Sequence, residues 1–245
     1  MKLAYQNEQE IADLVNGLAD SEIGFFPGHS ELGQRALTSL RGDTLKRRER
    51  PDFEDVSHSL LLEPMIVDDH PPIAGKDATR AREGAVLREL RSAGFGEMFP
   101  NASLVANVDT GLPTEEDHNY RAYLDQFTTV VAKHAAKTGA YRAQRPGFDL
   151  GFLILDESTA YLENRGAFGR THSGRLHAWF DDAGFLRVIR NAGIDLALWL
   201  TPYKHVTTLE LGWFALPKLS IIDVSLLRIH QPQYYDARRM ISSER

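Results

Sequence analysis

Cysteine is absent from the 245 residues of this sequence. Its absence excludes disulfide bonds, thiolate metal sites, iron–sulfur clusters and a cysteine nucleophile, and it agrees with a reducing compartment. Histidine, serine, the carboxylates, lysine and arginine remain available for chemistry. A chain of this length can bury a large apolar core, so it does not need cross-links for stability.

Long apolar runs are also missing. No window approaches the roughly 18 consecutive apolar residues that a membrane-spanning helix needs, and residues 1–10 lack the apolar stretch of a secretion signal. We therefore predict a cytoplasmic protein without a membrane partner. With 28 lysines and arginines against 34 acidic residues, the formal net charge is −6, which argues against a nucleic-acid partner. A local basic cluster could still bind phosphate.

Apolar periodicity predicts alternating helices and strands. Helical spacing is expected in residues 7–18, from Ser30 onward, and in residues 82–92, 118–137 and 178–192. Apolar runs typical of strands occupy residues 23–26, 59–67, 104–108, 150–155, 194–200, 206–211 and 219–227. This order predicts an α/β fold, a single domain over residues 1–230 with a mixed twisted sheet flanked by helices. Residues 231–245 are polar and are expected to form a frayed tail or an arm that docks on a partner.

Two catalytic patterns are present only in part. Residues 153–157 have the apolar-strand-then-Asp-Glu form that holds magnesium in P-loop NTPases, but no phosphate loop accompanies them. We therefore interpret them as a buried strand with an acidic exit turn. His172, His177, Asp181 and Asp182 are of metal-binding types, although a polar loop that runs into a helix accounts for their spacing as well. A metal-dependent enzyme that uses these four residues remains an alternative.

A third pattern indicates an anion site. Residues 28–37 contain a turn with two glycines that leads into a helix, and such a turn presents backbone N–H groups to an anion. Arg35 and the nearby Arg47, Arg48 and Arg50 could add bidentate donors to phosphate oxygens. A solvated charged helix and linker is the alternative interpretation.

The same segment resembles a known family. Residues 23–37, which read IGFFPGHSELGQRAL, are similar to the signature GWFQGRMEFGPRALGNRS in the carboxy-terminal domain of the O-carbamoyltransferases of antibiotic biosynthesis and nodulation-factor decoration. The matching positions are Gly28, Glu31, Gly33, Arg35, Ala36 and Leu37. Fainter matches follow in order: residues 48–63 resemble REPFRPFAPSVLEE, residues 107–109 resemble HVDG, residues 138–149 resemble TGVPVLLNTSFN, and residues 180–195 resemble a helix and its following GLD strand.

The resemblance implies a YrdC-like fold and a nucleotide-binding function. In that family this domain forms carbamoyl adenylate from carbamoyl phosphate and ATP, and a separate Kae1-like domain, which carries a metal, transfers the carbamoyl group to an alcohol. By resemblance, Arg35 and Glu31 would be catalytic, with ATP and Mg²⁺ as cofactors and a Kae1-like protein as partner. The residues that would bind ATP and carbamoyl phosphate are Gly28, Gly33, Arg47, Arg48, Arg50, Arg145, Phe148 and Asp149. We assign no protein ligands to a metal in this domain.

Several departures from the family pattern support a second hypothesis. The Asn and Ser of NTSFN fall on Arg145 and Gly147, and the second Arg of RALGNRS falls on Leu40. Each missing phosphate-binding group would cost about 2–4 kcal/mol of transition-state stabilisation, by analogy with a lost oxyanion donor. The alternative is therefore a degenerate, non-catalytic binding or scaffold module of the same fold.

Overall fold

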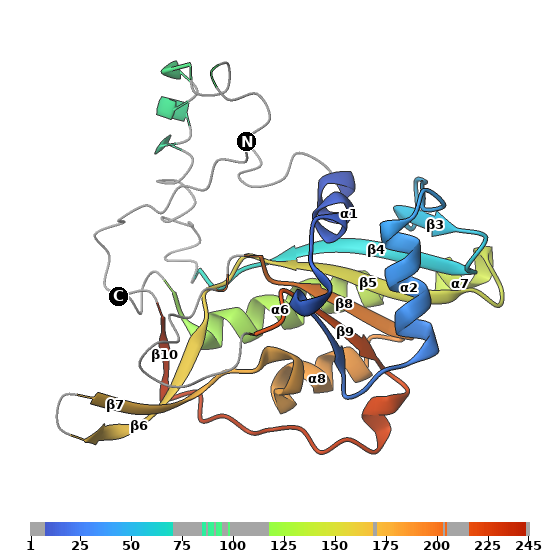
Figure 1. The fold of residues 1–245 in the computed structure, drawn as a ribbon. Helices are drawn as coiled ribbons and strands as arrows, with labels where there is room; N and C mark the ends of the chain where they lie inside the picture. Colours follow the sequence, from blue (N-terminus) through green and yellow to red (C-terminus); the bar gives the residue numbers. More distant parts are fainter. Residues whose placement is uncertain are drawn as a thin grey trace.

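A mixed sheet forms the centre of the protein, and helices cover both of its faces (Figure 1). The computed structural model describes residues 8–70, 85–86, 88–90, 92–94, 98, 118–168, 171–202, 204 and 216–243. The strands of the main sheet are β1 (Ile23–Phe26), β2 (Lys46–Arg47), β3 (Phe53–Asp55), β4 (Leu60–Val67), β5 (Asp149–Asp156), β8 (Leu196–Leu200) and β9 (Leu219–Asp223). Their order is β1-β9-β8-β5-β4-β3-β2. The predicted α/β class with a mixed sheet is confirmed.

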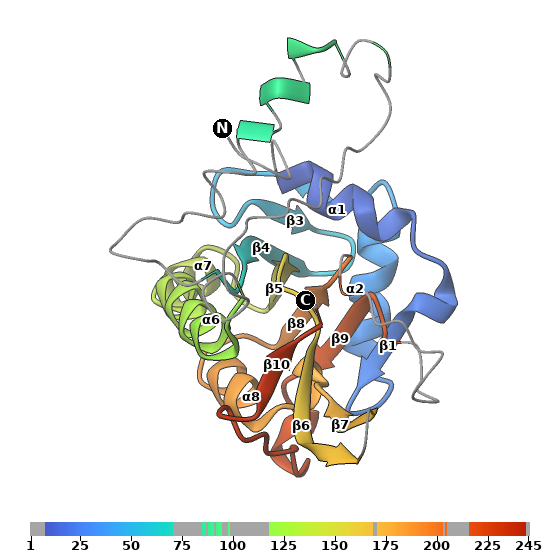
Figure 2. The ribbon, with the colours of Figure 1, turned by 90° about the vertical axis from the view of Figure 1, so that its left-hand side faces the viewer.

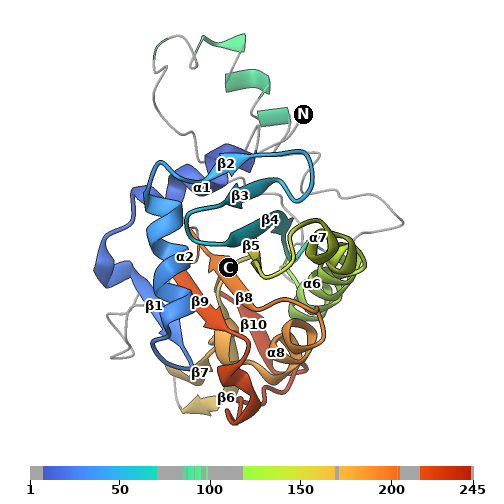
Figure 3. The same cartoon turned by 90° about the vertical axis from the view of Figure 1, so that its right-hand side faces the viewer.

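Three central strands share one direction. β4 pairs with β5 and β5 pairs with β8, in both cases in parallel, whereas β3 and β9 pair antiparallel with this central group. The amino-terminal ends of these three strands therefore lie together on one side, here called the amino end of the sheet. Their carboxy-terminal ends lie together on the opposite side, here called the carboxyl end. Figure 3 looks onto the side that carries α7 (Thr138–Gln144) and the β2–β3 hairpin, and Figure 2 onto the opposite side.

Apolar side chains on both faces of the sheet explain the three layers. Alternate residues of a strand point to opposite faces, and the fully buried central strands are apolar on both. Leu60 and Leu62 of β4 pack in the cluster with α1 (Glu8–Asn16) and α2 (Glu31–Arg41). Leu61 and Met65 belong to the cluster on the other face, where α6 (Tyr120–Ala135) and α8 (Ala183–Arg190) lie (Figure 3).

A smaller sheet lies beyond the carboxyl end of the central strands. It has the order β10-β6-β7 and consists of β6 (Tyr161–Phe168), β7 (Thr171–Leu176) and β10 (Met240–Ser242), which are seen at the left of Figure 1. β10 pairs antiparallel with β6, and Asp182 forms a β-bridge with Gln233. The expectation of a frayed tail over residues 231–245 is therefore wrong for the described part of that segment, because backbone pairing holds it against the domain.

Local side-chain hydrogen bonds explain where predicted and observed boundaries differ. The helix expected over residues 178–192 begins only at Ala183, since Asp182 caps it by accepting from the Gly184 N–H at 2.7 Å. The strand expected over residues 219–227 ends at Asp223, whose carboxylate accepts from the backbone and hydroxyl of Ser225 at 2.9 and 2.6 Å. Such local bonds turn the chain away from regular structure.

Some expected elements lie outside the described residues. These are the strands over residues 104–108 and 206–211 and most of the helix over residues 82–92. In the part of the chain that the structure describes, no helix combines the length and the apolarity that crossing a membrane requires.

Candidate functional site

Two segments singled out by the family resemblance meet at the amino end of the sheet. Arg35 from α2 donates to the carboxylate of Asp149, the first residue of β5, at 2.6 Å, although 114 positions separate them. The same guanidinium donates to the His58 carbonyl at 3.1 Å. The backbone N–H of Asp149 donates to the Ser59 carbonyl at 2.9 Å, so the starts of β4 and β5 are fastened together beneath Arg35.

Two further arginines share one carboxylate next to this contact. Arg145 donates to Glu54 of β3, and a guanidinium nitrogen of Arg48 lies 3.4 Å from the same carboxylate. Arg48 also donates to the side chain of Gln144 at 2.9 Å, and the guanidinium of Arg145 lies 5.9 Å from the Phe148 ring centroid. Arg48, Arg145 and Phe148 therefore lie near one another at this end of the sheet.

An open cavity of about 490 Å³ lies at this end of the sheet. Its lining residues are Arg48, Glu49, Arg50 and Gln144. Arg50 is exposed and forms no ion pair with any residue that the structure describes. The four arginines of this end, Arg35, Arg48, Arg50 and Arg145, are here called the arginine cluster. Glu49, Glu54 and Asp149 lie among them, so most of the positive charge is already balanced.

The remaining predicted site residues have other surroundings. Gly33 is buried, and a Cβ atom there would lie 2.9 Å from Ile221 of β9, so this glycine permits the close packing of α2 on the sheet. Gly28 has open space where a Cβ would be. Glu31 is exposed one turn before Arg35, and Arg47 is exposed in β2. These residues border the arginine cluster in sequence, but no described contact aims them at the cavity.

A second polar group lies at the carboxyl end, and of its members sequence reasoning had singled out only Asp156. β4 leads into Asp69 and His70, β5 ends at Asp156, and Lys204 follows β8. In open α/β sheets, ligands bind outside the carboxyl ends of the parallel strands. The side chains of Asp69 and Asp156 are fully buried, and that of Lys204 is only 1% exposed.

Asp69 is held by donors from three residues. Its Oδ2 accepts from the backbone N–H and the hydroxyl of Thr159 at 3.1 and 3.0 Å and from the Tyr161 hydroxyl. Its Oδ1 lies 3.0 Å from Nδ1 of His118. Burial opposes ionisation of the Asp69 carboxyl, but the hydrogen bond and charge of His118 outweigh it, so the pKa lies below its ordinary value.

Lys204 and Asp156 form a buried ion pair beside Asp69. Lys204 Nζ lies 3.3 Å from Asp156 and donates to the Thr159 carbonyl at 2.9 Å and to the Ser158 hydroxyl. Asp156 also accepts from the Trp199 indole at 2.9 Å. Burial lowers the pKa of Lys204, and the attraction of Asp156 only partly offsets this effect.

The four residues of the metal alternative separate into two contacts. His177 and Asp182 are both buried, and Nε2 of His177 lies 2.8 Å from the carboxylate of Asp182. Burial lowers the pKa of His177. Asp181 instead contacts His230 at 2.6 Å. The side chain of His172 lies outside what the structure describes. The described members therefore do not converge on one point.

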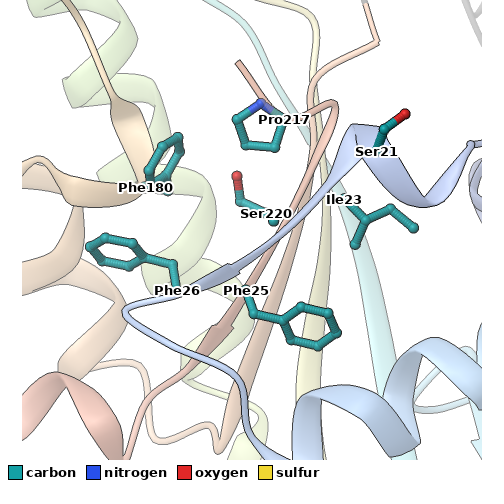
Figure 4. Close-up of a pocket in the computed structure, with 8 residues that line it drawn as sticks. Ser21, Ile23, Phe25, Phe26, Phe180, Pro217 and Ser220 are labelled. Atoms are coloured by element: carbon teal, nitrogen blue, oxygen red, sulfur yellow. The ribbon is translucent and has the colours of Figure 1, made fainter. Parts of the chain in front are cut away.

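A cavity of about 300 Å³ lies beside the edge strand β1 (Figure 4). Its lining is largely aromatic and apolar, with Phe26 and Phe180 on one side and Phe25 on the other (Figure 4). The Ser220 hydroxyl is buried there without a hydrogen-bond partner in the described part of the chain. No charged side chain is among the described residues that line it, so its chemistry does not fit the predicted anion site.

Comparisons of the chain with protein-family models, with curated proteins and with solved structures find no match. The resemblance to the O-carbamoyltransferases therefore depends on the residues quoted above.

Proposed function

We propose that this protein binds a phosphorylated ligand at the arginine cluster, as a nucleotide- and phosphate-binding domain like the one that forms carbamoyl adenylate in O-carbamoyltransferases. One observation carries the proposal. Arg35, from the segment with the most specific resemblance, contacts Asp149, the last residue of the TGVPVLLNTSFN-like stretch, at 2.6 Å. Arg48 and Arg145 lie around Glu54 at the same end of the sheet, beside an open cavity.

The ion pairs of the cluster leave donors for a ligand. A guanidinium group has five N–H donors in a rigid fork, and one carboxylate uses at most two of them. The side chains of Arg35 and Arg145 are 42% and 45% exposed, so their remaining donors face solvent. In this arrangement Asp149 and Glu54 orient the guanidinium groups, and the exposed Arg50 supplies the charge that no described carboxylate balances.

The chemistry implied by the resemblance is adenylyl transfer. In that chemistry water first hydrolyses carbamoyl phosphate to carbamate and inorganic phosphate. A carbamate oxygen then attacks the α-phosphorus of ATP, the bond to the β-phosphate breaks, and pyrophosphate leaves. Negative charge on the phosphate oxygens increases along this path, so the arginines would act by positioning and by charge neutralisation. Magnesium, if bound together with the nucleotide, would supply further charge neutralisation. A Kae1-like partner in the cytoplasm would then receive the carbamoyl group.

A second candidate function follows from the same ion pairs. Three of the four arginines already contact a carboxylate, and each cation that is unavailable to the transition state would cost about 2–4 kcal/mol. Two such losses would nearly abolish catalysis without preventing ligand binding. This observation favours a non-catalytic binding or scaffold module.

Calorimetry with ATP, carbamoyl phosphate and inorganic phosphate tests binding, and a carbamoyl-phosphate-dependent ATP–pyrophosphate exchange assay tests catalysis. We expect Arg50→Ala to weaken binding at least tenfold, because a hydrogen bond to a charged group contributes about 1.5–3 kcal/mol. Arg238→Ala is the matched control, since Arg238 is also exposed but lies on the segment before β10. Binding with exchange supports the enzyme, and binding without exchange supports the scaffold. No binding of any of the three ligands contradicts both.

A further inference from the structure

Three side chains at the carboxyl end form a compact set of potential metal ligands. One ligand atom from each of Asp69, His70 and His118 lies within 4.8 Å of the other two. Asp69 and His70 follow β4, whereas His118 lies two residues before the first residue of α6. We name these three residues the Asp-His-His cluster. It shares no residue with the arginine cluster and lies at the other end of the parallel strands.

Backbone and side-chain contacts fasten the two segments of the cluster to each other. The Asn119 N–H donates to the Asp69 carbonyl at 3.2 Å, and the Gln126 side chain donates to the His70 carbonyl at 2.9 Å. The rings of His70 and His118 have their centroids 5.0 Å apart. The first turns of α6 therefore hold both histidines beside the end of β4, so the ligand atoms are placed before any ion arrives.

The surroundings of Asp69 match those of a metal-binding carboxylate. Ligating carboxylates are themselves held by hydrogen bonds from neighbouring groups, which fix the direction of the free oxygen. Thr159 and Tyr161 occupy Oδ2, which leaves Oδ1 on the side of His118, 3.0 Å from its Nδ1. Ligand atoms on a tetrahedral zinc ion, at about 2.0–2.1 Å from the metal, lie roughly 3.3 Å from each other. A small opening of this contact accommodates the ion.

The local charge balance also favours a cation. Asp156 pairs with the ammonium of Lys204 at 3.3 Å, so this cation already has a carboxylate partner. Asp69 remains as a buried carboxylate, and the neighbouring Asp68 is buried as well. The side chain of His118 keeps 10% of its surface exposed, which leaves a way in for a small ion.

We propose that Asp69, His70 and His118 bind a divalent transition metal. Two imidazoles and one carboxylate suit zinc, with cobalt as its spectroscopic substitute, better than they suit magnesium or calcium, which prefer oxygen ligands. Three protein ligands leave a coordination position for water or for an anionic substrate group, as in catalytic zinc sites. The proposal does not depend on the function proposed for the arginine cluster.

The chain offers a matched control for this site. Glu63 lies in β4, which Asp69 and His70 follow, and His134 lies in α6, which His118 precedes; the side chains of Glu63 and His134 contact at 2.8 Å. No second histidine completes a metal-ligand group there among the described residues. A simple carboxylate–histidine pair and a metal site therefore make different predictions for two variants, His134→Ala and His118→Ala.

Titration of chelator-treated full-length protein with zinc and with cobalt tests the proposal. We expect one equivalent of zinc to bind, visible absorption bands from the cobalt form, and a zinc-dependent rise in melting temperature. His118→Ala and His70→Ala should each weaken zinc binding at least 100-fold, and His134→Ala should leave it within about twofold. Circular dichroism of each variant establishes that it folds before binding is compared. The proposal is overturned by the lack of saturable binding in the wild type, by zinc binding that survives both substitutions, or by equal losses in all three variants.

Discussion

The two ends of the parallel strands differ in how they hold charge. At the amino end, arginines pair with carboxylates at the solvent-exposed surface. The side chain of Arg35 is 42% exposed and that of Asp149 is 33% exposed. At the carboxyl end, Lys204 and Asp156 pair in the interior, at 1% and 0% exposure. Water screens the first kind of pair, whereas the second pair lies in a medium of low dielectric constant. At the amino end, a ligand can therefore replace the carboxylate partner of an arginine at a small free-energy cost. The buried Lys204–Asp156 pair at the carboxyl end cannot exchange its partners in this way.

The largest effect is expected at the carboxyl end. Lys204→Met should lower the free energy of unfolding by about 3–5 kcal/mol, because removal of one partner leaves a buried charge uncompensated. Denaturant unfolding of the variant measures this loss. A loss below about 1 kcal/mol would mean that Asp156 is adequately stabilised by Trp199 and its other donors, and the contrast between the two ends would fail.

The second effect concerns the helix that presents Arg35. Gly33→Ala should cost about 1–3 kcal/mol, since its Cβ would lie 2.9 Å from the Ile221 side chain and the packing of α2 on β9 would have to change. Gly28→Ala is the control, with nothing within 4 Å of the new Cβ, and should change stability by less than about 0.5 kcal/mol. Equal melting temperatures for the two variants would contradict a packing role for Gly33.

A buried carboxylate near the amino end sharpens the comparison. Although burial opposes ionisation, hydrogen bonds from Ser39, Thr44 and His58 lower the pKa of Asp55 to about 2. A depressed folded-state pKa stabilises the protein above the ordinary pKa of 3.8, and this contribution disappears as the pH falls toward 2. It amounts to about 2 kcal/mol, since one pKa unit corresponds to about 1.4 kcal/mol.

Urea unfolding between pH 5 and pH 2 measures the contribution of Asp55. The stability difference between the wild type and Asp55→Asn should shrink as the pH falls through this range, because both side chains are then neutral. A difference that stays constant across the range would show that the pKa of Asp55 is not depressed.

The smallest effect is expected for the exposed pair at the amino end. Arg35→Ala should change the free energy of unfolding by about 0–1 kcal/mol, as is usual for solvent-exposed ion pairs, and the change should decrease at high salt. Denaturant unfolding at two salt concentrations provides the measurement. A salt-independent loss above about 2 kcal/mol would show that Arg35 is needed for the stability of the fold. It would then be a poorer candidate for a ligand-binding residue.

The fold could be predicted where a segment carries its own pattern. The continuous apolar run of β5 identifies a strand that is buried on both faces, and α6 has helical periodicity with Asn119 as its cap. The contact of Arg35 with Asp149 was predicted only as a shared site, through the family resemblance. The geometry of this ion pair depends on the position of Asp149 as the first residue of β5. No local sequence pattern predicts that this position lies next to Arg35.

The carboxyl-end group could not be predicted because its members lie far apart in the sequence. Asp69 belongs to a stretch rich in Asp, Pro and Gly that has the composition of a surface loop, and 49 positions separate it from His118. Lys204 follows a turn, and only the pairing of β5 with β8 brings it to Asp156. Polar residues at the carboxyl ends of two buried parallel strands were the available signal: Asp68-Asp69-His70 follow β4, and Asp156-Glu157 include the last residue of β5.

We propose that the arginine cluster, and not the Asp-His-His cluster, binds the phosphorylated ligand. Calorimetric titration of ATP with magnesium into the wild type, Arg50→Ala and His118→Ala tests it most directly. We predict that Arg50→Ala binds ATP at least tenfold more weakly than the wild type, whereas His118→Ala binds it with unchanged affinity. Loss of ATP binding in His118→Ala together with normal binding in Arg50→Ala would contradict the account and move the nucleotide site to the carboxyl end.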